Sequence, residues 1–163
     1  MSTPFGFPKL IPERARPYQG RRAGVVTRIT AAIIDAVVVV GIVASLYAVV
    51  IGAAYLIHPA RFHWPDNIGW SIPTVGVVVA AVYLTLAWSN TGRSWGGAVM
   101  GIRVVSRRGE RLPFAKAAVR AVLYVIFPIG LLWSAFNHSN RSVQDILLRT
   151  SVIYDWTPRT DAE

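Results

Sequence analysis

The sequence predicts an all-α membrane protein with about three transmembrane helices, and three observations lead to this fold class. Of its 163 residues, 53% are hydrophobic and only 15% are charged, whereas soluble domains average about 25% charged residues. The mean hydropathy is positive, at +0.44. Three windows contain no Asp, Glu, Lys or Arg, namely residues 36–60, 67–92 and 121–140, and each reaches the ~20 residues that a transmembrane helix needs. A buried helix of a soluble core is the alternative for one window, but three in so short a chain favour the membrane.

The first segment, residues 1–24, contains four prolines, five basic residues and no apolar run. We expect a disordered, basic and proline-rich tail, with a docking motif as the alternative. A cleavable signal peptide is not expected, because the apolar core of about 7–15 residues that it requires is missing. The transmembrane domain then covers residues 25–155, and residues 156–163 form a C-terminal tail.

The first predicted span, about residues 30–57, contains the carboxylate of Asp35 near its start. An acid at the centre of a membrane helix costs roughly 2.5 kcal/mol or more, so it usually faces a protein interior or a wet cavity and has a partner. Arg28 lies two helical turns earlier on the same face. Because about 10.5 Å of helix axis separates them, we expect each to meet a group from another segment.

The second span, about residues 68–88, lies between Trp70 and Trp88, whose rings favour the two headgroup regions. The loop that follows has little side-chain bulk, which allows close approach between backbones at Gly92, Gly96, Gly97 and Gly101. Residues 102–105 alternate and lead to the turn residue Gly109, which predicts a short cytoplasmic β-hairpin. Residues 151–154 have similar β propensity, so a sheet between residues 103–106 and 151–154 is the other pairing.

The third span, about residues 119–136, has Pro128 and Gly130 at its centre. These residues allow a broken, re-entrant segment that enters and leaves on one face of the membrane. One kinked helix is the alternative. The two readings place the C-terminus on opposite sides of the membrane.

The basic residues indicate the orientation, because positive loops remain in the cytoplasm. Six Lys or Arg lie at or before Arg28, only Arg61 lies between the first two spans, and seven lie in residues 93–120. We therefore expect a multi-pass protein of the inner or plasma membrane with a cytoplasmic N-terminus. Most of the net charge of +9 reflects this topology, and no recognition motif favours nucleic acid as a partner. The 15 arginines against two lysines suggest a GC-rich bacterial genome.

The sequence contains few residues in arrangements that are typical of catalytic or metal-binding sites. The chain has no cysteine, and its three histidines are scattered, so we expect no metal and no cofactor. No nucleophile or metal-hydrolase motif is present, so we expect no catalytic residue and no enzyme. Arg141 and Asp145 are spaced to share a helical face. The arginines predicted to neutralise Asp35 are Arg93, Arg120 and Arg141.

The chain resembles the RDD family of small integral membrane proteins, which is named for one arginine and two aspartates. The resemblance rests on R-I-T-A-A-I-I-D, which contains Arg28 and Asp35, and on G-R-S-W-G-G-A-V-M-G-I-R-V-V followed by P-F-A-K-A-A-V-R, which ends at Arg120. It continues in R-S-V-Q-D-I-L-L-R-T-S-V-I, which contains Asp145. Many members read T-P-G-K in the middle motif, where this chain has Ser94, Trp95, Gly96 and Gly97.

The resemblance implies a membrane-embedded domain for which transport of ions or small solutes is the usual suggestion. Three spans enclose little space, so a pathway would require a homo-oligomer or another membrane subunit. A cluster of Arg28, Asp35 and Asp145 could equally serve to lock helices together. The alternative function is an accessory or scaffold protein whose basic cytoplasmic face binds a partner or anionic membrane lipids.

Overall fold

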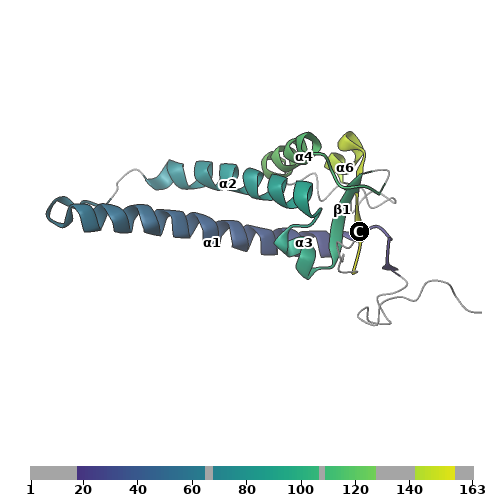
Figure 1. Cartoon of the computed structure of the whole chain (residues 1–163), viewed down its shortest axis with the longest axis horizontal. Helices are drawn as coiled ribbons and strands as arrows, with labels where there is room; N and C mark the ends of the chain where they lie inside the picture. The colour runs from purple at the N-terminus through teal and green to yellow at the C-terminus, as the bar shows by residue number, and fades with distance from the viewer. Residues whose placement is uncertain (1–17, 65–67, 107–108, 128–141, 157–163) are drawn as a thin grey trace, which may run out of the picture.

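The computed structural model describes residues 18–64, 68–106, 109–127 and 142–156. Two long helices, α1 (Val25–Ile57) and α2 (Ile68–Asn90), run side by side in opposite directions, and a 3-10 turn, η2 (Pro59–Arg61), follows α1 (Figure 1). Short elements gather at the other end of this helix pair, and we call them the head. They are α3 (Trp95–Val99), β1 (Ile102–Ser106), α4 (Phe114–Ile126), α6 (Val143–Leu148) and β2 (Thr150–Tyr154).

The helices α1 and α2 are apolar around their whole circumference, which is typical of membrane spans. Residues Val25–Ile57 and Gly69–Asn90 are long and apolar enough to cross a membrane, yet only 6% and 11% of their most apolar windows are buried. A core helix of a soluble protein would be mostly covered. The 33 residues of α1 extend for about 50 Å, well beyond the ~30 Å hydrocarbon core. The helix begins earlier than predicted, and its first turns lie in the head.

The predicted third span is not confirmed. The helix α4 begins at Phe114 and ends at Ile126, and its 13 residues extend for only about 20 Å. It ends because Phe127, with φ −126° and ψ 64°, precedes Pro128, and a residue before proline is disfavoured in the helical region. The described helix therefore stops at Ile126 and does not continue through Phe127. Pro128, Gly130 and the rest of that prediction lie outside the described residues.

The two faces of α4 differ in an unusual way. Its inner face is buried and contains Ala117, Arg120 and Ala121, and it packs against α2. Its outer face exposes large apolar side chains at Phe114, Val119, Val122 and Ile126. This arrangement, with the charge inside and apolar groups outside, suits a helix that is in contact with lipid.

A two-stranded antiparallel sheet closes the head. Strand β1 pairs with β2, with Val104 opposite Val152 and Arg103 opposite Ile153. The predicted local hairpin is therefore not confirmed, and the alternative pairing with residues 151–154 is the one observed. Residues just before α1 join the other edge of β2, where Ala23 N–H donates to Val152 O at 2.9 Å. The end of the predicted tail is thus tied to the sheet.

The buried core lies between the sheet and the helix ends, where α1 meets α3. Small side chains at Ala31, Ala117 and Ala121 allow close packing around Trp88 and Leu84. The closest approach is at Gly96, where an added Cβ would collide with the backbone carbonyl of Ala31 and lie 3.0 Å from Asp35 Cγ. Gly96 therefore fixes how near α3 can come to α1.

We predict that Gly96→Ala destabilises the head, because the methyl group must push α3 away from α1. Overpacking of this kind costs about 1–3 kcal/mol, and the thermal stability of the protein in mild detergent measures it. Gly69→Ala is the matched control, since a Cβ at Gly69 on α2 meets no atom within 4 Å. Equal stability of the two variants would contradict the observed packing of α3.

Candidate functional site

The charged cluster of the head is centred on Asp145, which lies in the first turn of α6. Ser142 caps this helix, and its hydroxyl accepts a hydrogen bond from Asp145 N–H at 3.2 Å. In return, Asp145 Oδ2 accepts from Ser142 N–H at 3.3 Å. This reciprocal capping box fixes the carboxylate at the helix end.

Two arginines from distant segments bind this carboxylate. Arg28 Nη1 on α1 lies 2.5 Å from Asp145 Oδ2, and Arg120 Nη1 on α4 lies 2.6 Å from Asp145 Oδ1. Arg120 Nη1 also donates to Thr150 Oγ1 at the start of β2, and the guanidinium lies 5.1 Å from the centroid of the Trp88 ring. All three charged side chains are at most 4% exposed. Helix α1 and three elements of the head, α4, α6 and β2, are thereby joined at one anion.

The environment of Asp145 keeps it ionised. Burial alone would raise the pKa of Asp145, but the charges of Arg120 and Arg28 and their hydrogen bonds lower it well below its ordinary value of 3.8. The carboxylate therefore remains an anion throughout the neutral and mildly acidic range.

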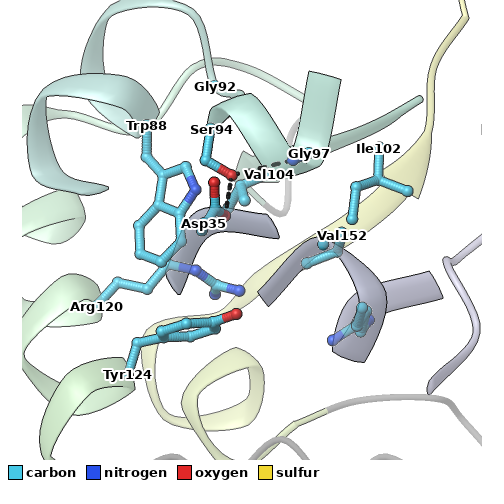
Figure 2. A pocket seen from close by; sticks show the side chains of 12 residues that line it. Asp35, Trp88, Gly92, Ser94, Gly97, Ile102, Val104, Arg120, Tyr124 and Val152 are labelled. Carbon is cyan, nitrogen blue, oxygen red and sulfur yellow. Dashed lines mark hydrogen bonds between the residues drawn. The ribbon is translucent and has the colours of Figure 1, made fainter. Parts of the chain in front are cut away.

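The second carboxylate, Asp35, is held by neutral groups. Asp35 Oδ1 accepts from Tyr83 O–H and from Gly96 N–H, both at 2.8 Å, and Oδ2 accepts from Ser94 O–H at 2.5 Å. Figure 2 shows the hydrogen bond between Ser94 and Asp35. Tyr83 O–H is itself oriented by Trp95 N–H, which donates to it at 2.9 Å. The side chain of Asp35 is thus satisfied by α2 and by the start of α3.

The predicted ion pairs of Asp35 need correction. Among the described residues no arginine forms a salt bridge with Asp35. Arg120 is bound to Asp145, and Arg93 binds Asp155, with Nη2 2.8 Å from Oδ2. The reason is geometric, because donors from Tyr83, Ser94 and Gly96 already surround Asp35. Arg141 lies outside the described residues.

Three of the four predicted packing glycines, Gly92, Gly96 and Gly97, lie at the border of this site. Gly92 has φ +74°, a value that favours glycine, and its carbonyl accepts from Val104 N–H at 2.8 Å. Gly97 N–H donates to Ser94 Oγ at 3.1 Å, and a side chain at Gly101 would meet the ring of Trp156. Of these glycines, Gly96 and Gly97 leave room for Asp35 and Ser94 to meet.

Sequence reasoning did not find four residues that hold the site together: Tyr83, Ser94, Thr150 and Asp155. Ser94 had a signal, since it precedes a glycine pair and can cap a short helix. Asp155 also had a signal, because it directly follows β2, and pairing β2 with β1 places Asp155 near Arg103. In the structure, Arg103 Nη1 lies 3.4 Å from Asp155 Oδ2. Tyr83 and Thr150 had no signal in the sequence, because their contacts depend on how the helices and strands pack.

A small cavity lies between the hydrogen-bonding groups around Asp35 and the ion pairs around Asp145. Its volume is about 40 Å³. Asp35, Trp88, Arg120 and Tyr124 surround it (Figure 2), and Arg28 also contributes to its lining. The four charges of Arg28, Arg120, Asp35 and Asp145 balance. The described residues contain no group of three or more metal-ligating side chains.

These charged positions fall within a match to a protein family. A family model described as the RDD family matches residues 22–149. The chain belongs to the RDD family. The match includes Arg28, Asp35 and Asp145, the arginine and two aspartates on which the resemblance rests. No curated protein and no solved structure matches the chain. Family membership and the two apolar helices make it a membrane protein.

We predict that Asp145→Asn strongly destabilises this RDD protein. The substitution leaves two buried arginines without an anion, and breaking a buried ion pair typically costs about 3–5 kcal/mol. Denaturation in mild detergent measures the loss. Asp155→Asn is the control, because its carboxylate is 13% exposed and its loss is expected to cost less.

The effect should also depend on pH in a defined direction. Because the folded-state pKa of Asp145 is depressed, its stabilisation is complete above the ordinary value of 3.8 and is lost as the pH falls toward the folded-state pKa. The stability difference between wild type and Asp145→Asn should therefore be constant from about pH 5 to pH 8 and shrink below about pH 4. A difference that shrinks near neutral pH would contradict the buried ion pairs.

Proposed function

We propose that this RDD protein takes part in the transport of ions or small solutes across the membrane. The observation that carries the proposal is the position of Asp35, an ionisable side chain only 6% exposed on an apolar membrane helix, beside a cavity with polar groups. Ionisable residues within membrane helices are rare, and they commonly mark ion or solute pathways. The proposal assigns no catalytic residue, no metal and no cofactor to the protein.

Such a pathway would lie between copies of the chain or between this chain and another membrane subunit. Only 6% of the most apolar window of α1 is buried within the chain itself, which leaves this helix open to a neighbouring subunit. One face of α1 presents small residues in the order Gly41, Ser45, Ala48 and Gly52. Small residues at this spacing let membrane helices approach closely. This face supports a homo-oligomer as the working unit.

The proposed orientation places the head in the cytoplasm and the protein in the inner or plasma membrane. Exposed basic side chains of the described residues lie in or next to the head at Arg21, Arg111, Lys116 and Arg149. Only Arg61 lies at the far end of the helix pair. The positive-inside rule then favours a cytoplasmic N-terminus and head.

We predict that purified protein in liposomes carries a measurable flux of protons, sodium or another small ion, read with an entrapped fluorescent indicator. Asp35→Asn removes the charge but keeps the shape, so the flux should fall to that of empty liposomes while the oligomeric state stays unchanged. Asp155→Asn should keep the flux, because Asp155 lies away from the cavity. If wild type carries no ion and Asp35→Asn changes only the assembly, the transport proposal fails.

A scaffold that holds anionic lipid is the second candidate, and the exposed basic side chains of the head favour it. Under this function, anionic lipids should remain with the detergent-purified protein, and the double substitution Arg111→Gln with Lys116→Gln should reduce their amount as measured by mass spectrometry. Arg61→Gln is the control at the other end of the helices. Retention that is equal in all three proteins would argue against this role.

A further inference from the structure

The cavity beside Asp35 contains a buried donor without an acceptor. Arg120 is 1% exposed, and its Nη1 binds Asp145 and Thr150, but its Nε–H has no hydrogen-bond partner in the described part of the chain. A buried, unsatisfied polar group costs about 1–3 kcal/mol, more for a charged one. Nearly all buried polar groups have a partner, which is either another protein group or ordered water.

Two further polar groups line the same cavity. Within the described ranges, neither the indole N–H of Trp88 nor the hydroxyl of Tyr124 forms a hydrogen bond with the protein. Figure 2 shows the Trp88 ring beside Asp35, and the Tyr124 hydroxyl and the Arg120 guanidinium directed into the space below it. Asp35 accepts two hydrogen bonds on Oδ1 but only one on Oδ2, so Oδ2 can accept another.

The ligand that suits this lining must accept from Arg120 Nε–H and donate to Asp35 Oδ2. A small anion meets only the first requirement, and the balanced charges of the two arginines and two aspartates provide no excess positive charge to hold it. A small cation can bind the Asp35 carboxylate, but it cannot accept from Arg120 Nε–H. The volume of about 40 Å³ is far below the ~300 Å³ of the smallest usual pockets for organic ligands, but it has room for a few water molecules.

We propose that this cavity is a binding site for ordered water that bridges Arg120 Nε to the Asp35 carboxylate. The water accepts from the guanidinium and donates to Oδ2, with Trp88 and Tyr124 as additional partners. It joins the hydrogen bonds around Asp35 to the ion pairs around Asp145, so that one connected network extends from α3 to α6. The site does not depend on whether the protein transports anything.

X-ray radiolysis tests the site, because bound water yields hydroxyl radicals next to the side chains that it contacts. The intact protein in lipid nanodiscs is irradiated with and without a scavenger of bulk radicals, and oxidation of Tyr124 is measured by mass spectrometry. We expect oxidation of Tyr124 to persist in the scavenger. Oxidation of Tyr18, which is 52% exposed, should be lost there. If the scavenger also abolishes the oxidation of Tyr124, the proposal is overturned.

A pair of matched variants ties the signal to this cavity. Val152→Ile adds one methylene group to a side chain that lines it, so the scavenger-resistant oxidation of Tyr124 should be lost. Val105→Ile adds the same group at a buried position of β1 that does not line the cavity, so the oxidation should remain. Equal oxidation in both variants would contradict the site. The buffer chloride is also replaced by a large organic anion. If the scavenger-resistant oxidation of Tyr124 then increases, the cavity binds halide and the water proposal is overturned.

Discussion

Asp145 forms ion pairs with Arg28 and Arg120, which are 117 and 25 residues away in the sequence. The elements of the head pack around these ion pairs. Removal of a single charged group from water costs several kcal/mol, and only good geometry with complete hydrogen bonding compensates for that cost. Displacement of α1, α4 or α6 would leave at least one of these charges buried and unpaired. The ion pairs therefore constrain which elements meet. The reciprocal cap with Ser142 fixes where α6 presents the carboxylate.

The first three turns of α1 contain both Arg28 and Asp35. Arg28 faces α6, while Asp35, two turns later, faces α2 and α3. Gly96 allows α3 to come close enough for a backbone N–H to reach Asp35. In the middle motif, the two residues that bind Asp35 are the hydroxyl residue Ser94 and Gly96, which retain the character of Thr and Gly in T-P-G-K. Gly97 stands at the lysine position and lines the cavity, so no side chain from that position fills the space beside Asp35.

Much of the fold could be predicted because it depends on local rules. The two long helices followed from uncharged windows, and the close approach at Gly96 followed from a lack of side-chain bulk. The expectation that Arg28 meets a group from another segment is confirmed, but the pairing of Asp35 with Arg93 or Arg120 was wrong. Spacing within one helix places Arg28 and Asp35 on one face, yet it contains no information about α6, which reaches Asp145 only through the packing of distant segments. Tyr83 was not found because a tyrosine in an apolar helix carries no signal until the register of α1 against α2 is known. The early end of α4 could have been predicted, because Phe127 precedes Pro128 and a residue before proline is disfavoured in the helical region.

The two aspartates of the motif differ in what surrounds them, and this difference bears on their roles. Asp145 has both oxygens bound to arginine, and burial together with two full charges leaves it no freedom to change partners without disrupting the head. Asp35 has only neutral donors, and it lines a cavity and forms no salt bridge within the described residues. Loss of Asp145 is expected to break the fold itself, because it leaves Arg28 and Arg120 buried without an anion. Asp35 is therefore the position at which a functional effect can be separated from a structural one.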